Sequence, residues 1–352
     1  MPSHLRVLCA AKLHANQLER HLELLELLDD VAELHLVRHA PLSGRLSKLK
    51  EHIFTPRSLP QDIWRMYWLI RRVIREEKID WVVAFNPVPW GAVAAAAAKA
   101  EGVPCSLSLI GMDFLQVQSW WGGAFLHAIR GVESVTVTGQ AMVDGLVQRG
   151  VDERKITILP HSVDTERFRP REVERQFDIV SVGQLIHRKR MSVLIEALAL
   201  LKARGTSLRL GILGKGPEKD ALLEQIQASQ LSQEVQLLGY VDDVEQFLPS
   251  AEVFALVSSW EGVPFAMIEA MASGLVPVVT DVGTISDWVT AGETGEIVPV
   301  DDAPALAQVL EELFVRDRPR LEAMRDRGIA IRDRYSLKEG VGVWRKIFTT
   351  ES

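Results

Sequence analysis

The chain has 352 residues, of which 47% are hydrophobic and 25% are charged, so it can bury a sizeable core, and its length favours two domains. Its formal net charge is −7 and its pI is about 5.8. A protein that binds a phosphate backbone needs a concentrated basic face, so this acidic balance argues against nucleic acid as a partner.

The sequence has no basic stretch followed by a long apolar run at its start, and eighteen apolar residues run together nowhere in it. We therefore expect neither secretion nor membrane spanning, but a cytoplasmic location, with peripheral attachment at the inner face of the membrane as a variant. Cys9 and Cys105 lie in or beside apolar runs. Both are predicted to be small core residues rather than a disulfide pair, which fits a reducing compartment.

Short β-branched runs alternate with longer helical patterns, which is typical of βαβ units in a parallel sheet. In the first half this pattern predicts strands at residues 5–10, 34–37, 81–85, 105–109, 134–137 and 156–159. In the second half it predicts strands at 178–182, 208–213, 235–238, 253–256 and 276–280. The expected fold is α/β, with two doubly wound sheets.

A polar stretch at 160–175 separates the two halves and lacks an apolar period, which indicates an interdomain linker. We expect domains at 1–170 and 171–335, followed by a C-terminal helix at 336–352. That helix has Val341, Trp344, Ile347 and Phe348 at helical spacing, so another surface must cover this face. One way to cover it is for the helix to pack back on the first domain.

The first motif with chemical meaning follows the strand at 178–182. Gly183 ends the strand, and Arg188 and Lys189 follow within one short loop. Glycine lets backbone approach a ligand, and the cations can form charge-assisted hydrogen bonds to a diphosphate. The alternative is a solvated basic turn.

The second motif follows the strand at 253–256. Glu261 and Glu269 lie eight residues apart around a predicted helix start, for which Pro264 suits the first position. The N–H groups of a helix start can receive phosphate or sugar oxygens, and the carboxylates can accept from sugar hydroxyls. The alternative is two unrelated surface acids.

Residues 261–280 resemble the Glu-x7-Glu signature of the family-4 retaining glycosyltransferases of the GT-B fold. Further motifs similar to that family are Pro160-His161-Ser162-Val163-Asp164 with Phe168 and Pro170, Gly183 with Leu185 and Lys189, Gly214-Lys215-Gly216-Pro217, Leu238-Gly239-Tyr240-Val241 and Gly292-Glu293-Thr294-Gly295. The resemblance covers roughly 156–310 and is only general in the first half. It implies two facing Rossmann-like domains with an interdomain cleft.

The resemblance also implies site roles. Lys189, helped by Arg188, would bind the donor diphosphate, Glu269 the ribose hydroxyls, and Glu261 would face the transferred sugar. The expected donor site consists of Gly183, Arg188, Lys189, Leu238, Tyr240, Glu261, Gly262, Val263, Pro264, Phe265 and Glu269; the expected catalytic residues are Asp113, Lys189 and Glu261. No metal or cofactor is required in such sites, and no metal-ligand spacing is visible here.

Several positions depart from the family pattern. The loop at 10–16 has no glycine, although Lys12 or His14 can substitute by side chain. Ile110 stands where the family tends to have histidine or arginine before a Gly-x-Asp, while Asp113 fits that pattern or serves as a helix N-cap. Gln184 and His161 replace the usual arginine and asparagine.

The acceptor side is the least defined. In the predicted helix 61–77, Ile63, Tyr67, Ile70 and Ile74 form one stripe, and Trp64, Trp68, Arg71 and Arg75 form another. The second stripe suits a membrane interface or a lipid-linked acceptor, or else a packed helix whose arginines extend to solvent. Trp120 and Trp121 either stack on an acceptor sugar or anchor a loop.

Together these features predict a glycosyltransferase that moves a hexosyl group from a nucleoside diphosphate sugar to a hydroxyl acceptor with retained configuration. A UDP-sugar is favoured, with a GDP-sugar next, and the acceptor is a carbohydrate or a lipid-linked sugar. Polysaccharide, lipopolysaccharide or glycolipid synthesis is the expected setting. The alternatives are a noncatalytic sugar-nucleotide sensor or scaffold and, less favoured, a nucleotide-sugar epimerase.

Overall fold

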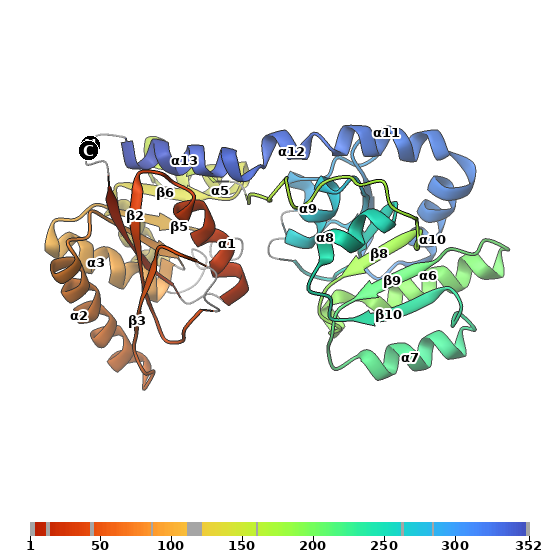
Figure 1. Cartoon of the computed structure of the whole chain (residues 1–352), viewed down its shortest axis with the longest axis horizontal. Coiled ribbons are helices and arrows are strands. Elements are labelled where there is room, and N and C mark those ends of the chain that lie inside the picture. The colour runs from red at the N-terminus through yellow and green to blue at the C-terminus, as the bar shows by residue number, and fades with distance from the viewer. Residues whose placement is uncertain are drawn as a thin grey trace. The chain divides into compact units, whose positions relative to one another are not determined.

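The computed structural model of the chain describes residues 4–11, 15–42, 46–85, 87–110, 122–159, 161–261, 264–283 and 285–349. The chain forms two compact units, shown in Figure 1: unit 1 is Met1–His161 with Leu337–Ser352, and unit 2 is Ser162–Ser336. The break lies before residue 170, because part of the expected linker packs on unit 2. Val163 bridges to Ser336, and Phe168 is buried in the core of unit 2.

Unit 1 is built on a seven-stranded sheet in the order β3-β2-β1-β4-β5-β6-β7, and all strand pairs are parallel. The strands are β1 (Leu5–Ala10), β2 (Val31–Arg38), β3 (Leu49–Ile53), β4 (Trp81–Phe85), β5 (Cys105–Ser108), β6 (Ser134–Val137) and β7 (Ile156–Ile158). The strand order reverses between β1 and β4, so the switch point of this sheet lies there.

Helices cover both faces of this sheet: α1 (Ala15–Glu26), α2 (Leu59–Glu77), α3 (Ala92–Glu101), α4 (Gly122–Arg130), α5 (Gln140–Val147) and α13 (Leu337–Thr349). Strand β1 shows how the faces divide, since Leu8 packs with α2 to α5 and Val7 packs with α1 and α13. In α13, Trp344 is fully buried and Phe348 contacts Trp81 with ring centroids 5.3 Å apart. The C-terminal helix thus belongs to the core of unit 1.

Unit 2 has a six-stranded sheet in the order β10-β9-β8-β11-β12-β13, again with parallel pairs. The strands are β8 (Ile179–Val182), β9 (Leu210–Leu213), β10 (Val235–Gly239), β11 (Val253–Leu256), β12 (Val276–Thr280) and β13 (Glu296–Val298). The helices are α6 (Met191–Ala203), α7 (Lys219–Ala228), α8 (Val244–Phe247), α9 (Phe265–Ala272), α10 (Ala303–Glu311), α11 (Arg318–Gly328) and α12 (Ile331–Arg334). Its switch point lies between β8 and β11.

The α/β prediction of two doubly wound sheets is confirmed, and each predicted strand is present with small shifts at its ends. Two edge strands escaped prediction. Strand β3 has three consecutive polar residues between Leu49 and Ile53 and no β-branched run, and β13 has only three residues. Edge strands bury less apolar surface than central ones, so their sequences carry a weaker signal.

Cys9 and Cys105 are free thiols buried in the core of unit 1, as predicted. Burial raises the pKa of both thiols far above the ordinary value, because the thiolate would lose its solvation. Neither side chain is therefore suited to nucleophilic or redox chemistry.

Candidate functional site

The candidate site lies at the carboxyl edge of the unit 2 sheet, on both sides of the switch point. Gly183 follows β8, and Ser258 and Glu261 follow β11 two to five residues after its end at Leu256. In the sheet, β8 and β11 are neighbours. Ligands of open α/β folds bind at such a point, because loops from adjacent strands diverge there and leave room between them.

Lys189 comes from a short helical turn, η4 (His187–Lys189), between β8 and α6. Its backbone N–H donates to the Ile186 carbonyl at 2.8 Å, and Arg190 at φ 52° turns the chain into α6. The Lys189 side chain lies against Gly183, where an added Cβ would come within 3.3 Å of Lys189 Cε. Glycine at 183 therefore leaves the space through which the lysine reaches the sheet edge.

Lys189 and Glu261 form an ion pair, with Nζ donating to Oε1 at 2.6 Å. The Ser258 hydroxyl donates to the same oxygen at 2.5 Å, and the Thr280 hydroxyl donates to the Ser258 carbonyl at 2.6 Å. Both charged side chains are largely buried, with 15% of Lys189 and 7% of Glu261 exposed. Pairing and hydrogen bonds offset the desolvation of these charges and hold the ammonium group in place.

A second contact joins the same two loops. The Ser259 N–H donates to the Arg188 carbonyl at 2.9 Å, and the Arg188 guanidinium lies 4.7 Å from the centre of the Trp260 ring. The loops after β8 and β11 are thus connected through backbone, ion pair and cation–π contact. The two motifs, which lie far apart in the sequence, are thus in direct contact in the structure.

Glu269 lies in α9 with only 6% of its surface exposed. A hydrogen bond to Glu245 and the charges of Glu245 and Glu269 raise the pKa of Arg167. Helix α9 begins at Phe265, so Pro264 occupies the cap position one residue before the predicted one. The predicted site residues Gly262 and Val263 lie outside the described residues.

Leu238 and Tyr240, which were predicted to lie near the nucleotide base, are at the end of the edge strand β10. Leu238 is half-buried in β10, whereas Tyr240 is 61% exposed just past it, with Lys215 Nζ 5.6 Å from the centre of its ring. The Gly214–Gly216 loop touches the loop after β8: a Cβ on Gly214 would lie 1.8 Å from the Gly183 carbonyl oxygen. This glycine permits a close approach of two backbones, so the loop packs against the loop after β8.

Two hydroxyl residues of the site, Ser258 and Thr280, were not among the predicted residues. Ser258 comes two residues after the fully buried strand β11, and Thr280 is the last residue of the fully buried strand β12. A polar residue at the carboxyl end of an apolar parallel strand was the signal that could have found them.

The predicted acceptor-side residue Asp113 lies outside the described residues, as do Lys12, His14, Trp120 and Trp121. Ile110 is described and packs against the core cluster that contains α1 and α13. Its apolar side chain therefore has a packing role in unit 1.

Helix α2, at the lower edge of unit 1 in Figure 1, buries Met66, Ile70 and Val73, while Trp64 and Trp68 are 65% and 45% exposed. The predicted arginines of its second stripe have a structural role. Arg71 and Arg75 both donate to Glu101 and hold the pKa of that carboxyl at about 2. The arginine stripe thus fastens α2 to α3.

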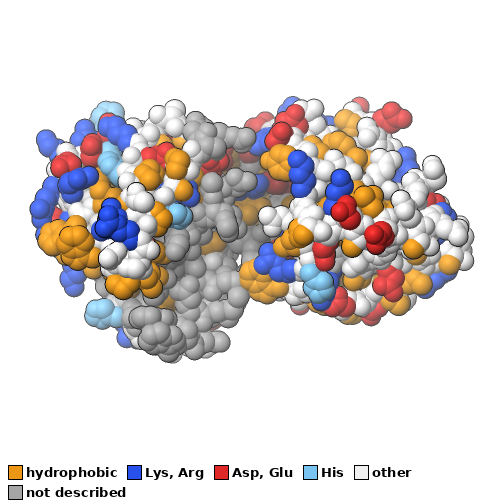
Figure 2. All heavy atoms as spheres, turned by 90° about the horizontal axis from the view of Figure 1, so that it is seen from below, with side chains coloured by type: hydrophobic (Ala, Val, Ile, Leu, Met, Phe, Trp, Pro, Cys, Tyr) orange, Lys and Arg blue, Asp and Glu red, His pale blue; other side chains and the backbone are white. Residues whose placement is uncertain are grey.

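Figure 2 shows lysine, arginine and hydrophobic side chains next to one another on the visible face of unit 1. None of the helices that the described residues form combines the length and hydropathy needed to traverse a bilayer.

Among the described residues, one group of potential metal ligands comes together, in unit 1. The ligand atoms of Glu33, His35 and Glu77 lie within 4.8 Å of one another. Lys50 Nζ already pairs with Glu33 at 3.0 Å, and His35 is hydrogen-bonded to His52 at 3.1 Å. The Lys50 ammonium and the His52 ring thus already serve as partners of Glu33 and His35 without a metal ion.

Two protein families match this chain. Residues 162–330 match Glycosyl transferases group 1, and residues 27–167 match Glycosyltransferase Family 4. The structure of HepE from Anabaena, solved in complex with UDP, superimposes with a TM-score of 0.81 at 16% identity and covers 98% of this chain and 99% of that one. These matches define a protein of two Rossmann-like units with the GT-B fold.

The putative colanic acid biosynthesis glycosyltransferase WcaL of Salmonella typhimurium is 37% identical over 191 residues, which cover 51% of this chain and 47% of WcaL. An N-acetylgalactosaminyltransferase of Campylobacter jejuni, whose name includes a diphospho-undecaprenol acceptor, is 32% identical over 51% of this chain and 50% of its own. In both pairs the likeness spans about half the length of the relative. The chain belongs to the family-4 glycosyltransferases of the GT-B fold.

Proposed function

We propose that the protein transfers a hexosyl group from a nucleoside diphosphate sugar to a hydroxyl acceptor, and that the Lys189–Glu261 site holds the donor. The observation that supports this most is a fixed, largely buried ammonium group at the switch point of unit 2, paired with Glu261 four residues before the start of α9. A diphosphate in this position would compete with Glu261 for Lys189. Release of Glu261 from the lysine would make its carboxylate available to sugar hydroxyls.

The proposed reaction breaks the bond between the anomeric carbon and the β-phosphate oxygen and forms a bond from that carbon to the acceptor oxygen. The acceptor hydroxyl proton passes to the departing diphosphate, so no protein nucleophile is needed. Lys189, helped by Arg188, would stabilise the negative charge that develops on the leaving group. Attack from the face of the leaving group retains the configuration, and Asp113 on the acceptor side remains a proposed catalytic residue.

A UDP-sugar is the favoured donor, since HepE has been solved with UDP and with UDP-glucose. Glu269 would accept from the ribose hydroxyls, with Leu238 and Tyr240 near the base. The names of the relatives support a carbohydrate or lipid-linked acceptor in surface polysaccharide synthesis. Contact of unit 1 with the inner face of a membrane, through the exposed Trp64 and Trp68, is part of this proposal.

The first test is the thermal shift of the wild type with UDP-, GDP- and ADP-sugars, repeated on Glu269→Ala. One donor should stabilise the wild type, and the variant should lose most of that shift, because its ribose contacts are gone. Glu224→Ala, which removes an exposed glutamate of α7, is the matched control and should respond like the wild type.

Radiolabelled or mass-resolved transfer to a lipid-linked sugar then separates the functions. Product formation supports the transferase. Donor binding without transfer to any acceptor would favour the sensor or scaffold, and a changed sugar nucleotide without acceptor would favour an epimerase. No shift with any donor would overturn the donor site.

A further inference from the structure

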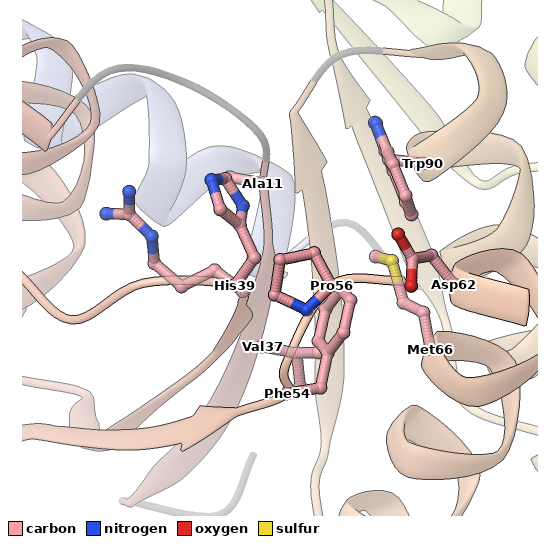
Figure 3. Close-up of a pocket in the computed structure, with 9 residues that line it drawn as sticks. Ala11, Val37, His39, Phe54, Pro56, Asp62, Met66 and Trp90 are labelled. Atoms are coloured by element: carbon pink, nitrogen blue, oxygen red, sulfur yellow. The ribbon is translucent and has the colours of Figure 1, made fainter. Parts of the chain in front are cut away.

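The carboxyl edge of the unit 1 sheet has a pocket of about 220 Å³. Figure 3 shows His39 on one side of it and Asp62 and Trp90 on the other, and Arg38, the last residue of β2, also lines it. The Nε and Nη1 atoms of Arg38 have no partner within the described residues and no access to solvent, so they do not contact the pocket. A buried donor acts on a ligand only through a side chain that itself reaches the ligand.

Unit 2 has two buried hydroxyl donors with such a link. Ser258 has no exposed surface, and only 1% of Thr280 is exposed. The Ser258 hydroxyl donates to Glu261 Oε1 at 2.5 Å, and the Thr280 hydroxyl donates to the Ser258 carbonyl at 2.6 Å. Strands β11 and β12 pair directly, which brings the residues at their ends together. Glu261 is therefore held by a chain of two hydroxyls beneath the surface of the site.

The hydrogen bonds of the Glu261 carboxylate fall on one of its two oxygens. Lys189 Nζ and the Ser258 hydroxyl both donate to Oε1. Oε2 has no hydrogen-bond partner within the described residues, and 7% of the side chain is exposed. Since an ionised carboxylate accepts at both oxygens, Oε2 is the atom left for a hydroxyl of a ligand.

A diphosphate that draws Lys189 toward itself leaves Ser258 as the remaining donor to Oε1 in the described part of the chain. We propose that Ser258 is a positioning residue for sugar recognition: it holds Oε1 of Glu261 while the lysine binds the diphosphate, so that Oε2 accepts from a hydroxyl of the transferred sugar. Thr280 fixes Ser258 in turn. The inference rests on the proposed function and deepens it, because it names what orients the sugar-binding carboxylate of the donor site.

Calorimetry with UDP and with UDP-glucose tests the inference, because only the second ligand presents a sugar to Glu261. In Ser258→Ala the dissociation constant of UDP-glucose should rise about tenfold and that of UDP should stay within about twofold, since one hydrogen bond to the sugar-binding carboxylate is lost. Ser258→Thr keeps the hydroxyl and should restore most of the UDP-glucose affinity. GDP and GDP-mannose replace these two ligands if only a GDP-sugar stabilises the wild type.

Ser181→Ala is the matched control. Ser181 is a buried serine of the neighbouring strand β8, and its hydroxyl donates to the Ala255 carbonyl at 2.8 Å rather than to Glu261. Ser181→Ala and Ser258→Ala should each lower the melting temperature by about 2–4 °C, because each loses one buried hydrogen bond. Only Ser258→Ala should change the ratio of the two dissociation constants, so a loss of stability alone does not reproduce the expected result.

Thr280 provides a second pair of variants, which decides the question if Ser258→Ala does not fold. Thr280→Val keeps the shape of the side chain without its hydroxyl and should weaken UDP-glucose binding about threefold while sparing UDP, whereas Thr280→Ser should bind both like the wild type. Equal weakening of UDP and UDP-glucose by Ser258→Ala, or no weakening of either, would overturn the inference, and so would equal effects of Thr280→Val and Thr280→Ser.

The same measurements separate this inference from the proposed function. If the wild type binds neither the nucleotides nor the nucleotide sugars, the proposed function fails and this inference fails with it. If the wild type binds both but the Ser258 and Thr280 variants do not discriminate between them, only this inference fails.

Discussion

A largely buried cation lies at the carboxyl edge of each sheet, but the two cations differ in their hydrogen-bond partners. In unit 2, Lys189 is paired with Glu261, whose carboxylate also accepts from Ser258. In unit 1, Arg38 lines a pocket with Nε and Nη1 unpartnered in the described part of the chain. Both edges lie at or beside the switch point of a parallel sheet.

The difference teaches how each site can respond to an anion. At the unit 2 edge a ligand must replace an existing carboxylate, so its binding is an exchange of partners and can move Glu261. At the unit 1 edge the Nε and Nη1 atoms of Arg38 have no partner within the described residues and no access to solvent, so an anion can reach them only if the side chains around them move. The paired edge has a recognisable sequence motif, whereas the unpaired edge consists of single residues from several strand ends.

Loss of the paired cation should have the largest effect. Lys189→Ala is expected to lower kcat/KM for sugar transfer by about 10²–10³, as removal of one transition-state donor does. It also leaves Glu261 buried without its cation, which should lower the free energy of unfolding by about 3 kcal/mol. Steady-state kinetics and urea unfolding measure the two effects.

The double variant Lys189→Ala/Glu261→Gln separates the loss of activity from the loss of stability, since it also removes the negative charge that Lys189→Ala leaves unpaired. It should recover stability without recovering activity. Lys202→Ala, which breaks a more exposed pair with Glu234 (Nζ–Oε1 2.7 Å), is the control and should keep wild-type activity. Wild-type kcat/KM in Lys189→Ala would end the assignment of the paired edge to the donor.

The close approach of the Gly214 and Gly183 backbones should have the next largest effect. In Gly214→Ala the new Cβ would meet the Gly183 carbonyl oxygen at 1.8 Å, so the loop that holds Lys189 must shift. We expect a loss of roughly 3 kcal/mol in unfolding free energy and about tenfold weaker UDP-sugar binding by calorimetry.

The matched control is Gly205→Ala. Gly205 also has a positive φ, 86°, but no atom lies within 4 Å of an added Cβ, so the cost should be about 1 kcal/mol with unchanged binding. Equal effects of the two substitutions would show that the positive φ, rather than the close approach to Gly183, determines the loss of stability and of binding.

The two units should also differ in how much stability they lose in acid. His21 is buried in unit 1 beside His161, with ring centroids 5.4 Å apart. Burial and the charge of Arg20 lower the pKa of His21 to about 4. Unfolded histidine takes up its proton near pH 6.5, so unit 1 should lose stability as the pH falls from about 6.5 to 4, by up to about 3 kcal/mol for His21.

Hydrogen exchange resolved by peptide at pH 7 and pH 5 measures this loss, and unit 1 should open before unit 2. His21→Phe should reduce the loss, because phenylalanine does not titrate, whereas exposed His4→Gln should not change it. Identical opening of both units in the wild type would contradict the prediction.

Periodicity alone predicted the two doubly wound sheets, because buried parallel strands are continuous apolar runs that recur between helices. The same local signal predicted the strand ends that hold Gly183 and Glu261 and, with the family resemblance, the importance of Lys189. The C-terminal helix was also predicted, from the spacing of Trp344 and its neighbours. Closure of the two units on a shared cleft stays a prediction.

Only the tertiary structure decided which side chains meet. Lys189 and Glu261 are 72 residues apart, and their ion pair follows from the adjacency of β8 and β11, which no local pattern encodes. The same holds for Arg38, Asp62 and Trp90, three residues whose sequence surroundings predict nothing in common. A sheet brings the ends of its strands to one edge in an order set by long-range pairing, so its sites are properties of topology rather than of any segment.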